Sequence, residues 1–218
     1  MTGLESPQFF PPDPDEEPLL HQREYTVRAY RMASDRMRIR GMVHDRKPAG
    51  TYIVGDTEPM SVHQMVVDLI VAFPSLEIVD AQVVMEVTPH AGCTSIEEVY
   101  QGLVGVSIAR GFTHLVRELF GGPRGCTHVG ALLQAMAPVA IQSLWSMRTQ
   151  GEQPVNLRAV STAERMEMMK VNFNTCHVWD TEGEHVKRLQ AGEMLDPPRW
   201  AVKRLEELGR SLEDWYER

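Results

Sequence analysis

A glycine-rich break followed by a long apolar stretch constrains this chain most. Residues 121–125 read Gly-Gly-Pro-Arg-Gly, and the apolar stretch continues to Trp145. Glycine and proline end one helix, and Cys126 or Thr127 can cap the next. Apolar side chains recur there at helical spacing: Val129, Leu132, Leu133, Met136, Ala140 and Leu144. The sequence therefore predicts a long helix that begins directly after the break.

The start of this helix is predicted to be a polarised site. Its free backbone N–H groups and the positive end of its dipole favour an anion or a developing negative charge. Arg124, Cys126 and His128 are grouped around it. A cysteine in such a place is a candidate nucleophile or ligand, and a histidine is a candidate acid or base. The alternative is that Cys126 is only a small buried residue and that His128 is bonded to a nearby carbonyl.

Composition and charge limit the protein classes that such a site can belong to. The 218 residues are 43% hydrophobic, which supports one sizeable core. Thirty acidic and 22 basic residues give a net charge of -8, which argues against nucleic acid or an anionic membrane as the partner. Without a membrane-length apolar run or a secretory signal, we expect a cytoplasmic protein. Three cysteines favour reduced thiols over a disulfide framework.

The order of elements predicts the fold class. Four strands are expected in two hairpins, over residues 25–32, 36–45, 63–72 and 76–87. Within 36–45 the side chains alternate, so that Met37, Ile39, Gly41 and Val43 share one face while Arg38, Arg40, Met42 and His44 share the other. Helices are expected over 96–104 and 106–120. Strands before helices indicate an α+β fold, an antiparallel sheet of about four strands covered by helices.

The two ends of the chain are predicted to differ from this core. Residues 1–22 are proline-rich and acidic and read as an extended tail. Residues 23–218 are expected to form a single α+β domain, with a core over 25–148 and a C-terminal extension over 149–218. Residues 166–179 read equally as strand or helix. An amphipathic helix over 197–218 must pack on the domain or on a second subunit, so a homodimer is one of two expected arrangements.

Other polar residues are weaker candidates. Arg38, Arg40, His44 and Arg46 form a strand face that is either solvated or lines a pocket for an acidic or phenolic ligand. His90 and Cys93 lie in a loop between sheet and helix, where function concentrates.

A simple zinc site built on the helix start is not favoured. Cys126 and His128 would lie on nearly opposite sides of a regular helix, although a non-helical cap would relax this. Adjacent Cys176 and His177 would point to opposite faces if they lie on a strand. We therefore predict no metal site. The chain also shows no recognisable serine triad, phosphate loop or dinucleotide fingerprint.

The layout of residues 63–145 resembles iron–sulfur cluster assembly scaffolds. The resemblance is carried by Val79-Asp80-Ala81-Gln82-Val83 in a strand, Gly92-Cys93-Thr94-Ser95 before a helix, Leu103-Val104-Gly105, and Cys126 at the start of a long helix. It implies the same fold. Cys93 and Cys126 match two cluster cysteines of that family, but no cysteine lies between them, where the family carries another. A metal or cluster carrier that uses these two cysteines is therefore the alternative function.

The segments Val43-His44-Asp45-Arg46-Lys47 and Arg124-Gly125-Cys126-Thr127-His128 resemble a bacterial family known only as a domain of unknown function. The chain also resembles the phenylcoumaran γ-formaldehyde lyases of lignin-degrading bacteria. That resemblance implies a cofactor-independent lyase, which releases formaldehyde from a small lignin-derived aromatic. The expected catalytic residues are His128, Arg124 and His44. The expected substrate contacts are Cys126, Thr127, His90, Cys93, Arg40 and Asp45.

Overall fold

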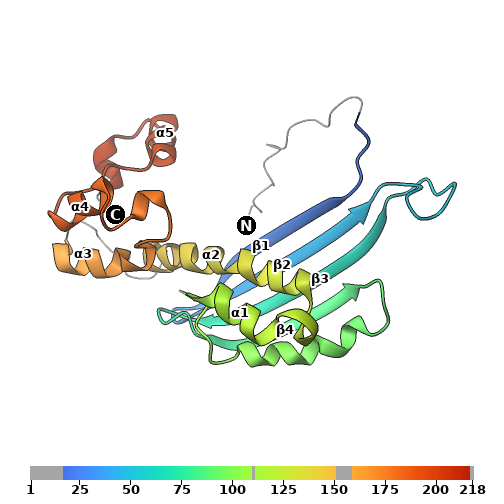
Figure 1. The fold of residues 1–218 in the computed structure, drawn as a ribbon. Helices are drawn as coiled ribbons and strands as arrows, with labels where there is room; N and C mark the ends of the chain where they lie inside the picture. Colours follow the sequence, from blue (N-terminus) through green and yellow to red (C-terminus); the bar gives the residue numbers. More distant parts are fainter. Residues whose placement is uncertain (1–16, 110, 151–158, 217–218) are drawn as a thin grey trace.

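Four strands form the base of the molecule. The computed structural model describes residues 17–109, 111–150 and 159–216. Within these residues one antiparallel sheet has the strand order β1-β2-β3-β4 (Figure 1). The strands are β1 (Gln22–Ala33), β2 (Arg36–Lys47), β3 (Met60–Ala72) and β4 (Ile78–Val87). Each strand pairs with the next along the chain, and helices follow, so the predicted α+β class is confirmed.

Helices cover one face of this sheet. They are the 3-10 helix η1 (Cys93–Leu103), α1 (Phe112–Phe120), the short η2 (Gly122–Arg124) and the long α2 (Thr127–Thr149). α2 contacts β1, β2 and β3, whereas η1 lies beside β4. The side chains predicted for the core side of α2, from Val129 to Leu144, are buried. The long helix expected after the glycine-rich break is therefore present, and it covers the core.

β2 has two distinct faces. Met37, Ile39 and Val43 are buried under α2, while Arg40 on the other face is exposed, as the alternation predicts. Gly41 lies directly under the helix, where an added Cβ would come within 2.7 Å of Sδ of Met136. The buried row does not stop at the last apolar residue. It continues to Asp45, a fully buried carboxylate at the end of the sheet near the start of α2.

α2 is tied to the edge strand β1 at its C-terminal end. The Arg31 guanidinium donates to the carbonyl oxygens of Ser146 and Met147, at 3.1 and 2.7 Å. These carbonyls lie in the last turn of the helix, where a cation is favourable. By length and composition α2 could cross a membrane, with a mean hydropathy of 1.2. The core helix of a soluble protein meets the same criterion, and α2 packs on the sheet.

Two predicted helices begin or end elsewhere. The helix expected over 106–120 begins only at Phe112, because the preceding residues bond to the sheet. Val106 accepts a hydrogen bond from N of Ile78, and N of Ile108 donates to Leu76, both at 2.8 Å. Gly111 then takes a positive φ of 86° at the helix start. The helix expected over 96–104 is the 3-10 helix η1.

The C-terminal elements gather beyond the end of α2 (Figure 1). They are α3 (Thr162–Met169), η3 (Lys170–Asn172), η4 (His177–Trp179), α4 (Glu184–Gln190), α5 (Arg199–Glu207) and η5 (Leu212–Trp215). The ambiguous residues 166–179 are thus helical and irregular, without a strand. Arg148 of α2 donates to the carbonyl of Met168 at 3.1 Å, which joins this region to the core.

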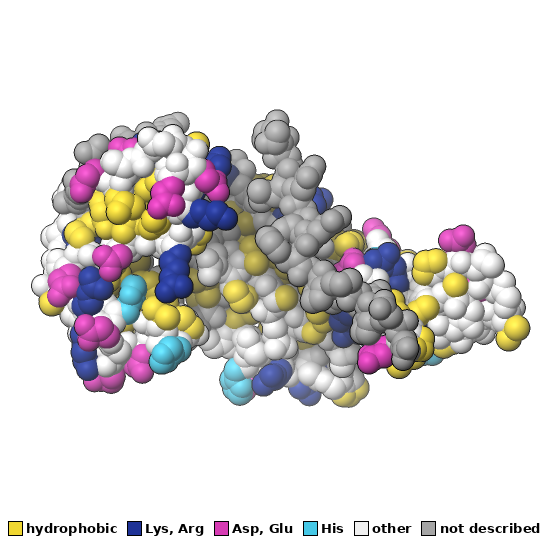
Figure 2. Space-filling model, turned by 90° about the horizontal axis from the view of Figure 1, so that it is seen from above, with side chains coloured by type: hydrophobic (Ala, Val, Ile, Leu, Met, Phe, Trp, Pro, Cys, Tyr) yellow, Lys and Arg dark blue, Asp and Glu magenta, His cyan; other side chains and the backbone are white. Residues whose placement is uncertain are grey.

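The C-terminal amphipathic helix is present but shorter than the predicted 197–218. α5 buries Ala201 and Leu205 and ends at Glu207, and Gly209 follows with a φ of 63°. The apolar stripe therefore does not continue, and Leu208 and Leu212 stay exposed. Figure 2 shows apolar side chains at the surface of this region, at the left, among charged ones. Most of the predicted tail lies outside the described residues.

Candidate functional site

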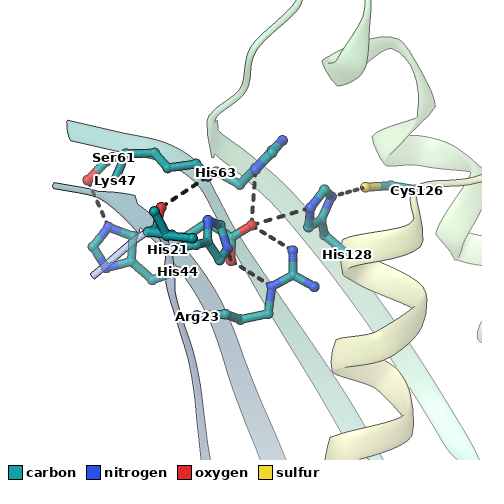
Figure 3. A network of polar contacts seen from close by, with 10 residues as sticks. His21, Arg23, His44, Lys47, Ser61, His63, Cys126 and His128 are labelled. Carbon is teal, nitrogen blue, oxygen red and sulfur yellow. Dashed lines mark hydrogen bonds and ion pairs between the residues drawn. The ribbon is translucent and has the colours of Figure 1, made fainter. Parts of the chain in front are cut away.

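Three neighbouring strands place a row of polar side chains on the helix-covered face. Arg23 of β1 pairs with Asp45 of β2 in the sheet register, and Asp45 pairs with His63 of β3. The register is antiparallel at both steps, so the three side chains lie next to one another. The start of α2 adds His128 above this row, and Figure 3 shows the rings of His63 and His128 beside Arg23.

Asp45 is the centre of the cluster. The Arg23 guanidinium donates to both carboxylate oxygens, at 2.6 and 2.7 Å. Oδ2 is also 3.1 Å from Nδ1 of His63 and 3.4 Å from Nε2 of His128. His21 lies 3.5 Å from Oδ1. The Asp45 side chain is 1% exposed, so these partners replace the water that a carboxylate needs.

The charges of the cluster set its protonation. Burial alone would raise the pKa of Asp45, but the bonds and charge of Arg23 outweigh it and lower the pKa from 3.8 to about 2. The same pairing raises the pKa of Arg23. Burial lowers the pKa of His128, and the neighbouring His63 and Arg23 lower it further. An ionised carboxylate therefore stands beside a His128 that is neutral at pH 7.

The Asp45 carboxylate faces a ring nitrogen of each of two histidines. Because it only accepts hydrogen bonds, the 3.1 Å contact is a bond donated by Nδ1 of His63, while the 3.4 Å contact with Nε2 of His128 is an ion-pair distance. Nδ1 of His128 is 3.6 Å from Sγ of Cys126. The two rings stack with their centroids 3.9 Å apart.

Cys126 reaches His128 because it is the N-cap of α2 and not part of its helical turn. Its backbone is extended, with φ -103° and ψ 132°. A regular helix would separate the two side chains by about 200°, at about 100° per residue. The backbone N–H of Cys126 donates to the Tyr100 hydroxyl at 2.7 Å, and burial raises the pKa of Tyr100. The relaxed cap geometry considered from the sequence is therefore the observed one.

Asp45, His63 and His128 are also the described residues that could hold a metal ion. One donor atom from each lies within 4.8 Å of the others. Two features oppose this use. The Arg23 guanidinium binds both carboxylate oxygens and brings a positive charge that opposes a cation at the same place. Two imidazoles on one tetrahedral ion would also place their ring centroids about 5 Å apart, not stacked at 3.9 Å. The arrangement fits hydrogen bonding to a carboxylate better than coordination of one ion.

The structure brings only some of the predicted site residues together. Cys126, His128 and Asp45 converge, and Thr127 is the first residue of α2. His44 lies on the opposite face of β2, where Nε2 is 2.8 Å from Oγ of Ser61. In Figure 3 its ring lies apart from those of His63 and His128.

Other predicted residues also lie apart from the Asp45 cluster. Arg40 is on the outer face with Asp68. Arg124 is exposed, and its described contact is a 3.5 Å bond to the carbonyl of Arg117. Cys93 begins η1, and His90 lies in the preceding loop, where its carbonyl accepts the N–H of Cys93.

Sequence reasoning missed His63, Arg23 and His21. Their positions depend on the register of three strands, and the connection between β2 and β3 spans residues 48–59. One available signal was the buried row of β2. Its period of two places Asp45 on the same face as Val43, which marks a carboxylate that must find partners under the helix.

A shallow groove between α1 and α2 lies apart from the cluster. It has a volume of about 450 Å³ and is lined by residues that include Phe112, Arg117, Gln134 and Ile141. None of its lining residues belongs to the Asp45 cluster. The Asp45 cluster and this groove are therefore separate features of the described structure.

Comparison with known proteins gives a family and no activity. No curated protein and no solved structure matches the chain significantly. Residues 21–142 match the family described as Protein of unknown function (DUF2889). This range holds the whole sheet and every member of the Asp45 cluster. It spans more than half of the 218 residues, and the chain therefore belongs to the DUF2889 family.

Proposed function

We propose that the protein is a cofactor-independent lyase that uses acid–base chemistry at the Asp45 cluster. The observation that carries this proposal is that one buried carboxylate lies within 3.4 Å of a ring nitrogen of each of two imidazoles. A histidine held in this way can accept a proton and return it. The side chains of His63 and His128 are 20% and 18% exposed, so a small substrate can reach them.

We assign the role of the base to His128. Its lowered pKa keeps it neutral at pH 7. When it takes a proton, the adjacent Asp45 carboxylate stabilises the resulting imidazolium. The start of α2 lies beside it, where an anion produced from the substrate is favoured.

The proposed reaction begins with a primary alcohol on a small lignin-derived aromatic. His128 takes the hydroxyl proton, and the carbon–carbon bond to the hydroxymethyl group breaks, so that formaldehyde leaves. The electron pair of that bond forms a carbon–carbon double bond and expels a phenolate from the adjacent carbon. The His128 imidazolium then protonates the phenolate, so the base is regenerated and no oxidant is consumed. The substrate class rests on the resemblance to phenylcoumaran γ-formaldehyde lyases.

Formaldehyde release from phenylcoumaran-type alcohols tests this function. We expect His128→Ala to lower turnover by about a hundredfold or more, the usual loss of a general base. His114→Ala is the matched control, because His114 is exposed on α1 and pairs only with Glu118 in the described structure. A folded His128→Ala protein with full turnover would remove this residue from the mechanism. Absence of formaldehyde with every such alcohol would exclude the lyase.

The alternative from the sequence, a metal or cluster carrier, predicts the opposite chemistry. Protein purified without air would contain stoichiometric metal or absorb visible light, and Cys93→Ser and Cys126→Ser would abolish both signals. The proposed lyase is expected to keep its turnover in the presence of chelators. Elemental analysis of the same sample that is assayed for formaldehyde separates the two functions.

A further inference from the structure

The thiol of Cys126 is part of the same proton path as Asp45 and His128. Sγ of Cys126 lies 3.6 Å from Nδ1 of His128, and Nε2 of the same ring lies 3.4 Å from Oδ2 of Asp45. The imidazole thus bridges a thiol and a buried carboxylate, and Figure 3 shows Cys126 at the far side of the His128 ring. The proposed lyase reaction does not use this sulfur.

The order of the three groups gives the thiol a proton acceptor. The Asp45 carboxylate lies 3.4 Å from Nε2 of His128 and favours the tautomer that is protonated there, in which Nδ1 accepts the Sγ–H of Cys126. Enzymes activate a cysteine nucleophile with a base and with a third group that orients the base. Cys126 also caps the N-terminus of the 23-residue helix α2, whose dipole favours negative charge on sulfur.

We propose that Cys126 is a nucleophile that adds reversibly to small aldehydes. Its lone pair forms a bond to the carbonyl carbon while the thiol proton passes to Nδ1 of His128. The carbonyl π electrons move to oxygen, which takes the proton from the imidazolium and becomes a hydroxyl. The product is a hemithioacetal, and its formation consumes no other reactant. The choice of formaldehyde as the natural aldehyde rests on the proposed lyase function; the reactivity of Cys126 does not.

One hydrogen bond favours addition over acyl transfer. In acyl transfer an oxyanion must be held by preorganised donors until the leaving group departs. The backbone N–H of Cys126 would be one such donor, but it already donates to the Tyr100 hydroxyl at 2.7 Å. A hemithioacetal oxygen is protonated as it forms. The observed contacts therefore suit an aldehyde better than an ester.

Alkylation by iodoacetamide, measured at each cysteine by mass spectrometry, tests the activation of Cys126. The chain provides its own controls, because Cys93 is partly buried like Cys126 and Cys176 is exposed. We expect Cys126 to react fastest in the folded protein although it is less accessible than Cys176. His128→Ala should slow Cys126 alone, by about a hundredfold. Asp45→Asn provides a second reading if His128→Ala does not fold. A Cys126 that reacts no faster than Cys176 overturns the proposal.

Protection by formaldehyde tests the aldehyde adduct directly. We expect formaldehyde to block alkylation of Cys126 at concentrations that leave Cys176 reactive, and dilution to restore the reaction. Equal protection of the two cysteines would overturn the adduct. This experiment adds formaldehyde itself, so it succeeds even if no aromatic alcohol releases formaldehyde. Failure here with normal lyase turnover would remove the thiol chemistry and leave the proposed function intact.

Discussion

Two aspartates on opposite faces of this sheet each form an ion pair with an arginine of a neighbouring strand. Asp45 takes two hydrogen bonds from Arg23, and Asp68 takes two from Arg40, at 2.8 and 2.6 Å. The first pair lies under α2, with the Asp45 side chain 1% exposed. The second lies on the opposite face, with Asp68 17% and Arg40 49% exposed. The geometry is nearly the same and the surroundings differ.

The difference shows what the helix adds to an ordinary cross-strand pair. Among the described residues, Asp68 gains only Arg38 as a further partner, at 3.6 Å, and water can reach the group. Asp45 loses water and gains histidines from a strand and from a helix start. A charge in that position polarises each of its neighbours, since little solvent screens it. Cover by α2 therefore turns an ion pair into a group that can direct proton transfer.

The largest expected effect is on stability. Asp45→Ala should lower the free energy of unfolding by about 3 kcal/mol, because it leaves Arg23 and the buried ends of two histidines without a partner. Asp68→Ala should change it far less, since Arg40 is half exposed. Urea unfolding of both variants measures the difference. Equal losses would show that cover by α2 does not distinguish the two pairs.

Acid should affect the covered pair selectively. The folded-state pKa of Asp45, about 2, lies below its ordinary value of 3.8, so its contribution is complete above about pH 4. It is lost as the pH falls toward 2, and amounts to about 2 kcal/mol. The unfolding free energy of the natural protein should therefore approach that of Asp45→Asn between pH 4 and pH 2. A constant gap across this range would contradict the pKa assignment.

A smaller loss of stability is expected when a methyl group is added to the helix-covered face of β2. Gly41→Ala should cost about 1 kcal/mol, because the new methyl group meets Met136 and Leu132, and the flexible Met136 thioether can yield only in part. Gly130→Ala in α2 is the matched control, since its Cβ has no neighbour within 4 Å. That change should stabilise the protein slightly through helix propensity. Thermal unfolding compares the two, and the same sign for both would refute tight packing under α2.

The smallest effect is expected on the outer face. His44→Ala should leave formaldehyde release nearly unchanged, in contrast to the loss of about a hundredfold expected for His128→Ala. His44 contacts Ser61 and lies across β2 from the Asp45 cluster. Turnover of the two variants, measured in one assay, decides which face holds the base. A large loss in His44→Ala would move the catalytic face to the other side of the sheet.

The sequence predicted local features better than it predicted which distant residues meet at the site. The alternation in β2 and the apolar spacing in α2 are encoded by near neighbours, and both are confirmed. His63 meets Asp45 through strand register, which no local pattern specifies. Cys126 meets His128 because the cap residue is extended, a backbone choice that helical periodicity cannot express. α5 ends at Glu207, and Gly209 follows with a positive φ. The helical spacing of apolar residues continues past this point and therefore did not indicate the end of the helix.

Because Arg31 of β1 binds the C-terminal end of α2, the length of the helix must match the length of the edge strand. Arg23 and Arg31 are eight residues apart, about 27 Å in a strand. His128 and Met147 are nineteen residues apart, about 29 Å in a helix. The two lengths agree within the reach of an arginine, so both ends of α2 are matched to one strand. Inserting one residue into β1 between these arginines would turn one of them to the opposite face, and the match would be lost at that end.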